Sequence, residues 1–371
     1  MRVRLFCAAA AALLSACSSL SPGPGLVTTE HRVPVVSTAP ATQGQQVQLY
    51  VREIAPAAPA GPRKAVVFVH GSGTPAEVSF DSSMPDYSWL ASVARAGFDV
   101  FSVSLTGYGR STRPAALNDP CNLSKEQQAR FIPAMIPAPC EPSYPRPMST
   151  MSSDWDDLDA VVDYVRRLRG VDRVSLVGWS QGGPRIVGFT ALHPQKVERI
   201  AVLAPAYTRD SATAAPNPLP SLPASMTVQS RQDFIANWDL QVGCRDQYDA
   251  AAAARIFDEM LESDPAGARW GPGVRRAPAV PTWGFNRAVA SRLQTPFLMV
   301  AGEHDKQVLP QRVRELYEDW GGRDKVLLQM GCSSHNAMWE KHRRQLYDAT
   351  VEWLRDGRVK GASSGVLRVG D

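Results

Sequence analysis

A serine lies between two glycines directly after a short apolar run. Residues 174–183 read VSLVGWSQGG, so that Gly178, Ser180 and Gly182 match the pattern G-x-S-x-G. Small residues on both sides allow a sharp turn from a strand into a helix, with the serine at the apex in a strained conformation. This position exposes the hydroxyl beside the positive end of the following helix. A structural turn would need the glycines but not the serine, so the pattern predicts a nucleophile.

A serine hydroxyl is a weak nucleophile without a base, so a histidine and a carboxylate should accompany Ser180. Asp305 follows the apolar run in TPFLMVAGEHD, and His335 follows a later run, in GCSSHNAMW. In this arrangement His335 would accept the serine proton, while Asp305 would hold the imidazole in the useful tautomer and stabilise its charged form. Glu303 is the rival acid, and His70 is interpreted as a structural histidine.

The elements that must position these residues alternate between strands and helices. The expected helices span 155–168, 183–194, 310–320 and 341–354, and the expected strands span 44–54, 64–71, 98–107, 173–178, 197–206, 295–305 and 325–331. The first of these strands alternates apolar and polar residues and is expected at an edge. Strands that alternate with helices predict a mainly parallel sheet covered on both faces. The four carboxylates of DWDDLD (154–159) are assigned to a solvated helix face rather than to a metal site.

Two long stretches interrupt this alternation. Residues 108–153 are rich in proline, and residues 207–294 mix helical with irregular segments. Both are too long for simple connections, so we interpret them as insertions over one end of the sheet. The core would then consist of residues 26–206, which include the first insertion, and residues 295–371. The second insertion is the better candidate for a cap or lid.

Three further motifs make the chain resemble the α/β-hydrolase superfamily, of the serine esterase and lipase type, over about residues 45–356. VVFVHGSG (66–73) is similar to the family's strand that ends in His-Gly, and LTGYGRS (105–111) is similar to its Gly-x-Gly-x-Ser loop. ALHPQKVERIAVLAPA (191–206) resembles the helix and strand that follow the nucleophile. The order Ser, Asp, His is also the order found in that family. The large insertions depart from the family pattern, so the resemblance does not extend to the substrate.

The resemblance implies an α/β-hydrolase fold and a triad of Ser180, Asp305 and His335. The oxyanion would be held by the backbone N–H groups of Gln181 and Ser72. The implied reaction is hydrolysis of a carboxylic ester, or a related acyl bond, of a small molecule through an acyl-enzyme. It needs no cofactor and no metal. Haloperoxidase-like perhydrolysis or carbon–carbon bond hydrolysis by the same triad is one alternative. A non-catalytic lipoprotein that binds a ligand or partner is another.

The N-terminus, MRVRLFCAAAAALLSAC, has a positive start, a short apolar run and then small residues. This is typical of a secretory signal peptide, here residues 1–16, and its apolar run is too short to span a membrane. LSAC resembles a bacterial lipobox, which predicts that Cys17 is lipidated and that residues 17–25 form a tether. We therefore expect an exported lipoprotein, anchored to a membrane and facing the periplasm or cell surface. The alternative is an ordinary signal peptide and a soluble exported protein.

Four of the six cysteines lie beyond the tether. An exported chain meets oxidising conditions, so an even number suggests two disulfides, with three possible pairings. We expect Cys121–Cys140 inside the first insertion and Cys244–Cys332 between the second insertion and the loop of His335. Four free thiols are the alternative. None of these cysteines has the spacing of a zinc site.

Composition adds broad limits. With 44% hydrophobic and 20% charged residues, the chain can form a substantial core. The net charge is +4, and no basic stripe suggests a nucleic-acid partner. The sequence does not indicate an oligomeric state.

Overall fold

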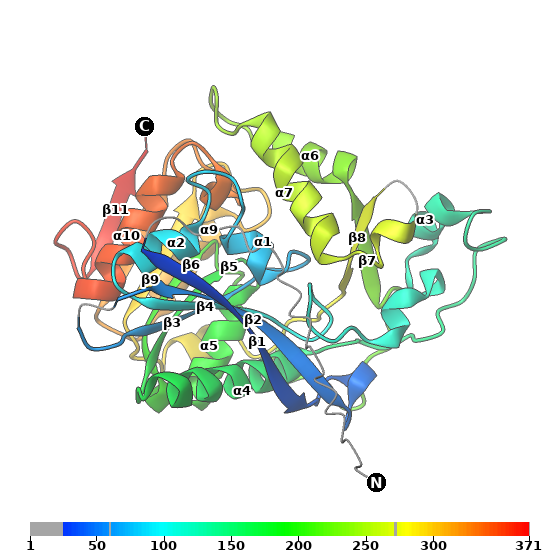
Figure 1. Ribbon diagram of the computed structural model, residues 1–371, viewed down its shortest axis with the longest axis horizontal. Coiled ribbons are helices and arrows are strands. Elements are labelled where there is room, and N and C mark those ends of the chain that lie inside the picture. The colour runs from blue at the N-terminus through cyan, green and yellow to red at the C-terminus, as the bar shows by residue number, and fades with distance from the viewer. Residues whose placement is uncertain (1–24, 59–60, 271–272, 371) are drawn as a thin grey trace, which may run out of the picture.

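The structure is a computed structural model that describes residues 25–58, 61–270 and 273–370. The expected signal peptide, Cys17 and nearly all of the tether lie outside these residues. Within them, nine strands form one sheet in the order β1-β2-β4-β3-β5-β6-β9-β10-β11 (Figure 1). The strands are β1 (Leu26–Val36), β2 (Gln46–Pro56), β3 (Ala65–Val69), β4 (Asp99–Ser104), β5 (Val174–Trp179), β6 (Val197–Leu203), β9 (Phe297–Gly302), β10 (Lys325–Met330) and β11 (Gly365–Val369).

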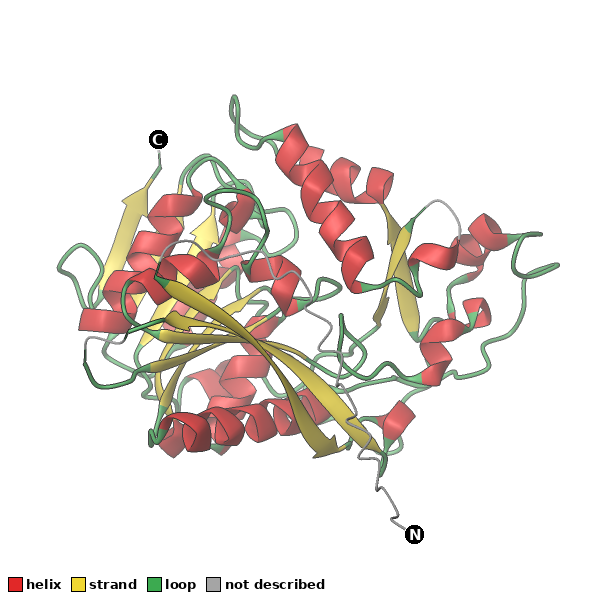
Figure 2. Cartoon of the chain, in the orientation of Figure 1, coloured by secondary structure: helices red, strands yellow, loops and turns green. Residues whose placement is uncertain are grey.

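The sheet is parallel from β4 to β11, whereas β1 pairs with β2, and β2 with β4, in the antiparallel sense. Helices lie on both of its faces (Figure 2). One face carries α1 (Ala76–Phe80), α2 (Trp89–Arg95) and α10 (Arg343–Asp356), and the other carries α4 (Met151–Arg169), α5 (Gly182–Leu192) and α9 (Pro310–Asp319). The predicted fold class is therefore confirmed.

The continuous apolar runs become central strands because both of their faces are buried. In β3, Val66 and Phe68 pack into the cluster under α2 and α10, while Val67 and Val69 pack into the cluster above α4 and α5. All four side chains are fully buried. Because the strands from β4 to β11 run parallel, their C-terminal ends lie at one edge of the sheet, where the following loops meet.

Residues 207–294, which we call the cap segment, hold two antiparallel strands and several helices. These are β7 (Met226–Ser230), β8 (Val274–Pro278), α6 (Arg231–Asp239), α7 (Ala250–Ser263) and α8 (Arg287–Ala290). In Figure 1, α6, α7, β7 and β8 lie to the side of the sheet, next to α3 (Lys125–Gln128) of the first insertion. An apolar cluster that includes Phe131, Met226 and Trp270 joins the two insertions.

Two expectations about the ends of the sheet are wrong. Residues 44–54 do not form an edge strand, because β1 pairs along the whole of β2, with His31 opposite Val51. The run at 325–331 is not the last strand, because β11 pairs in parallel with β10. Both added strands leave many side chains exposed, so neither has the apolar run of a buried strand.

The expected cysteine pairing is confirmed. Cys121 and Cys140 are bonded with their Cα atoms 5.2 Å apart, and Cys244 and Cys332 with theirs 5.6 Å apart. The second bond joins the cap segment to the loop that precedes His335. Disulfides of this kind are typical of proteins outside the cytosol. Across the described residues, none of the helices is both long and apolar enough to cross a membrane.

Candidate active site

Ser180 occupies a strained turn between β5 and α5. Its φ is +57°, in the left-handed region that residues other than glycine seldom adopt. Backbone hydrogen bonds hold the turn: Ser180 N–H donates to Leu203 O at 2.9 Å, and Ala206 N–H donates to Ser180 O at 3.0 Å. Gly182 has no room for a side chain, since a Cβ there would lie 2.4 Å from Val69 O. The glycine thus permits the turn, and Ser180 remains partly exposed at its apex.

Asp305 and His335 lie at the ends of neighbouring strands and are hydrogen-bonded. His335 Nδ1 is 2.8 Å from Asp305 Oδ2, and both side chains are buried. Asp305 Oδ1 accepts the backbone N–H groups of Gln307 at 2.7 Å and Val308 at 2.8 Å, which fix the carboxylate. Glu303, the rival acid, is exposed. The arrangement gives the imidazole an oriented, buried acceptor on one side.

Trp179 links the turn of Ser180 to the loop of His335. Its indole Nε1–H donates to His335 O at 2.8 Å, and the two rings lie 5.4 Å apart between centroids. Ser180 follows β5, Asp305 follows β9 and His335 follows β10, so all three lie at the C-terminal edge of the parallel sheet. The structure therefore brings the three predicted residues to one end of the sheet.

The loop after β3 approaches the same turn. A Cβ on Gly71 would lie 3.0 Å from Ser180 Cβ, so this loop passes directly beside the predicted nucleophile. Ser72, the next residue, is exposed, whereas Gln181 is nearly buried. The side chain of Gln181 donates through Nε2 to Val280 O, at 3.1 Å, in the cap segment.

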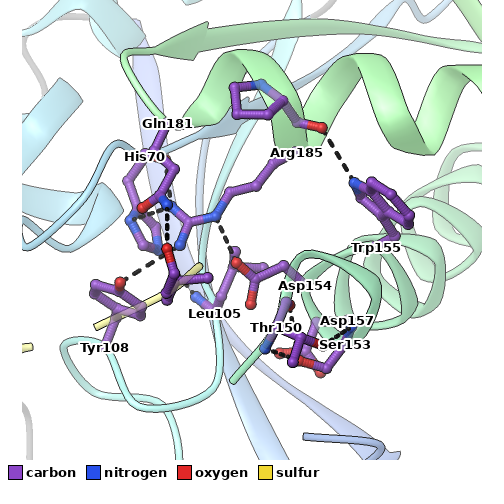
Figure 3. A network of polar contacts seen from close by, with 12 residues as sticks. His70, Leu105, Tyr108, Thr150, Ser153, Asp154, Trp155, Asp157, Gln181 and Arg185 are labelled. Carbon is purple, nitrogen blue, oxygen red and sulfur yellow. Dashed lines mark hydrogen bonds and ion pairs between the residues drawn. The ribbon is translucent and has the colours of Figure 1, made fainter. Parts of the chain in front are cut away.

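A buried arginine that the sequence analysis did not single out supports this loop (Figure 3). Arg185 of α5 is fully buried and donates through Nε to Asp154 Oδ2 at 2.7 Å. Its Nη1 donates to His70 O at 2.9 Å and to Gly71 O at 3.0 Å. In a trans peptide the C=O and N–H groups point in opposite directions. A carbonyl of Gly71 held by Arg185 therefore turns the N–H of Ser72 away from the arginine.

His70 completes this support as a neutral side chain. Its Nδ1 lies 2.7 Å from Gly71 O, and its Nε2 accepts the backbone N–H of Leu105 at 3.2 Å. Burial, together with the nearby Arg185 charge, holds the pKa of His70 well below its usual range. The imidazole thus donates at one nitrogen and accepts at the other, as its interpretation as a structural histidine requires.

The assignment of residues 154–159 to a solvated face is wrong for two of the carboxylates. Asp154 and Asp157 are buried on α4, because they bind partners inside the core rather than water. Asp154 pairs with Arg185, and Asp157 Oδ2 accepts the backbone N–H of Thr106 at 2.9 Å. Burial raises the pKa of Asp157 to about 7. Across the described part of the chain, no cluster of three or more histidine, cysteine or acidic side chains could hold a metal ion.

The sequence profile of the family described as alpha/beta hydrolase fold matches residues 64–342. The chain belongs to this family. Solved structures that resemble it include carboxylesterase CesB from Bacillus subtilis, at 15% identity, covering 89% of this chain and 93% of that one, with a TM-score of 0.52. A bromoperoxidase from Bacillus anthracis has 14% identity, with 88% and 100% coverage and a TM-score of 0.51.

A serine hydrolase from the polyaromatic-hydrocarbon-degrading bacterium Cycloclasticus zankles has 13% identity, with 89% and 99% coverage and a TM-score of 0.53. At these identities the likeness shows the fold alone. A shorter similarity links the chain to the poly(3-hydroxyalkanoate) polymerase subunit PhaC of Allochromatium vinosum, which is 44% identical over 46 residues. The match spans 12% of this chain and 13% of that protein. The family supports hydrolase activity.

Proposed function

We propose that the protein is a serine hydrolase that cleaves a carboxylic ester of a small molecule through an acyl-enzyme. The observation that carries this proposal is the Asp305–His335 hydrogen bond of 2.8 Å, beside a strained turn that presents Ser180. An imidazole oriented by a buried carboxylate is the base that a serine nucleophile requires. No cofactor takes part in this chemistry.

In the proposed reaction His335 Nε2 removes the Ser180 proton while Oγ attacks the ester carbonyl. The oxyanion forms beside the backbone N–H groups of Gln181 and Ser72 and is stabilised by hydrogen bonds from them. His335 then returns the proton to the departing alcohol, which leaves an acyl group on Ser180. Water, activated by the same imidazole, attacks this acyl group and releases the acid.

Arg185 acts as a positioning residue in this scheme. It touches neither the substrate nor Ser180, but it holds the carbonyls of His70 and Gly71 from below the loop. The N–H of Ser72 is thereby oriented before the substrate arrives. An oxyanion donor that needs no reorientation during the reaction is more effective than a mobile one.

A panel of p-nitrophenyl esters of increasing chain length tests the proposal. We expect hydrolysis by the wild type and a loss of roughly a thousandfold or more in kcat for Ser180→Ala. Ser221→Ala, at an exposed serine, is the matched control and should keep full activity. Equal rates for wild type and Ser180→Ala would contradict the proposed nucleophile.

The same residues would serve perhydrolysis, and the bromoperoxidase among the similar structures gives that reaction a specific comparison. Carbon–carbon bond hydrolysis is the other reaction open to this triad. Perhydrolysis is distinguished from ester hydrolysis by measuring halide oxidation in the presence of hydrogen peroxide and acetate beside the ester assay. A rate that exceeds ester hydrolysis would favour perhydrolysis as the main activity.

We also propose that the protein is an exported lipoprotein anchored through Cys17. The lipobox-like LSAC and the two disulfides support export. Two or more acyl chains would give a stable anchor. Wild-type protein should fractionate with membranes, and Cys17→Ser should be soluble or unprocessed. A Cys17→Ser variant that is cleaved normally and stays in the membrane would exclude this anchor.

A further inference from the structure

A second arginine of the cap segment lies against the loop beside Ser180. Arg275, in β8, places its guanidinium over Gly73, where a Cβ would come 2.1 Å from Nη1. Gly73 has a φ of +82° and lies two residues after Gly71, which borders Ser180. Two residues span at most about 7 Å of chain. The guanidinium and the proposed nucleophile therefore border the same short loop.

The Arg275 charge has no acidic partner among the described residues. Its Nε donates to Gln229 Oε1 at 2.8 Å, which fixes the plane of the guanidinium, and neither terminal nitrogen has a hydrogen-bond or ion-pair partner among the described residues. Burial lowers the pKa of Arg275 to about 10, so the group stays charged at neutral pH. A half-buried cation without a counter-ion is costly unless an anion joins it.

Arg276, the next residue of β8, differs from Arg275 because it has an acidic partner. Successive residues of a strand point to opposite faces. Arg276 is fully buried on the other face of β8 and pairs with Asp264, at 3.1 Å between Nη2 and Oδ1. Arg276 is thus satisfied inside the cap segment, whereas Arg275 faces the loop of the proposed oxyanion hole.

The cap segment also continues across the proposed site beyond Arg275. A Cβ on Gly107 would lie 2.9 Å from Pro278 Cγ, and Val280 O accepts the side-chain N–H of Gln181 at 3.1 Å. This run of the chain therefore passes from the loop after β4 to the side chain of Gln181, the residue next to Ser180.

We propose that Arg275 binds a carboxylate of the substrate, so that the enzyme prefers esters carrying a negative charge over neutral esters of the same shape. This inference rests on the proposed function of the same site. A guanidinium with two free nitrogens matches a carboxylate in a bidentate pair. The substrate carboxylate would serve as the counter-ion of Arg275 and would fix the substrate relative to Ser180.

The test compares two pairs of esters that differ only in charge. p-Nitrophenyl hydrogen adipate is paired with p-nitrophenyl 6-methylheptanoate, which places the carboxylate on the acyl side. 4-Acetoxybenzoate is paired with 4-isopropylphenyl acetate, which places it on the alcohol side. We expect the wild type to prefer the charged member of at least one pair in kcat/KM.

Arg275→Gln should lower kcat/KM for the preferred charged ester by roughly 10- to 100-fold, the range for hydrogen bonds between charged groups. It should change the neutral ester by less than about threefold, and Arg275→Lys should give an intermediate loss. Arg245→Gln removes an equal charge from an exposed position of the cap segment and serves as the control. It should leave all four rates unchanged.

Equal losses on charged and neutral esters in Arg275→Gln would show a structural role and overturn the proposal. So would a wild type that hydrolyses the neutral esters at least as well as the charged ones. Either result leaves the proposed hydrolase function intact. Calorimetric titration with adipate and with 4-hydroxybenzoate keeps the test independent of turnover. Tighter binding of one of them by wild type than by Arg275→Gln supports the anion site, and equal binding or none contradicts it.

Discussion

Replacing Arg185 with methionine should damage both stability and catalysis, for separable reasons. The arginine and Asp154 are fully buried and paired at 2.7 Å. Removing one partner of such a pair leaves an uncompensated charge, at a cost of about 3–5 kcal/mol. The substitution also removes the hydrogen bonds to the carbonyls of His70 and Gly71 that orient the N–H of Ser72. Loss of one oxyanion donor lowers kcat by about 100- to 1000-fold. Misorientation of that donor should cost roughly 10- to 100-fold.

The double variant Arg185→Met with Asp154→Leu separates the two effects. Apolar residues that replace both members of a buried ion pair often leave stability unchanged. Urea unfolding should therefore recover most of the loss seen in Arg185→Met alone. Steady-state hydrolysis of a p-nitrophenyl ester should stay slow, with kcat reduced and KM little changed, because Arg185 then no longer holds the Gly71 carbonyl. Recovery of kcat together with stability would refute the positioning role and assign Arg185 to packing alone.

Three further predictions concern the acid, a buried carboxyl and a disulfide. Asp305→Asn should lower kcat about 1000- to 10,000-fold, since an amide no longer selects the required tautomer of His335, and intact stability with normal kcat would contradict this role. The raised pKa of Asp157, about 7, means that the folded chain holds this proton more tightly than the unfolded chain, whose carboxyl titrates near 3.8. Protonated Asp157 therefore contributes its full stabilisation below about pH 4. Between about pH 4 and 7 this contribution falls by up to about 1.4 kcal/mol per pH unit, and it is lost as the pH rises through 7. The melting temperature should depend less on pH between pH 5 and 8 in Asp157→Asn than in the wild type. Parallel pH dependences of the two proteins would contradict the raised pKa of Asp157. Replacing Cys244 and Cys332 together with serine opens a loop of 88 residues and should lower the free energy of unfolding by up to about 4.5 kcal/mol in the chain-entropy model. Denaturation under non-reducing conditions measures this, and an unchanged midpoint would show that the bond does not restrain the unfolded chain.

The central strands could be predicted because burial on both faces leaves a continuous apolar run, as in β3 and β9. The two outermost strands could not. Residues 26–36 read LVTTEHRVPVV, with a largely exposed face, and residues 365–369 form only a short, partly exposed strand. Their place in the sheet depends on the backbone edges that β2 and β10 offer, which a local pattern does not contain.

The proposed triad could be predicted because loops that follow parallel strands meet at one edge of the sheet. Recognising where three apolar runs end was enough to select Ser180, Asp305 and His335. The two arginines could not be located in this way. The partner of Arg185 is Asp154, on another helix, and helical spacing alone predicts a solvent-exposed position for that aspartate. An arginine within the otherwise apolar GPRIVGF was the one available signal. Arg275 is defined by its contact with Gly73, far away in sequence, which only the folded chain reveals.

Covalent labelling tests the central claim, that Ser180 is the nucleophile, most directly. Purified protein is treated with a fluorophosphonate, digested and mapped by mass spectrometry. We predict a single adduct on Ser180, strongly slowed formation in His335→Ala, and no adduct in Ser180→Ala. An adduct on another residue, or labelling that persists in Ser180→Ala, would contradict the proposed mechanism.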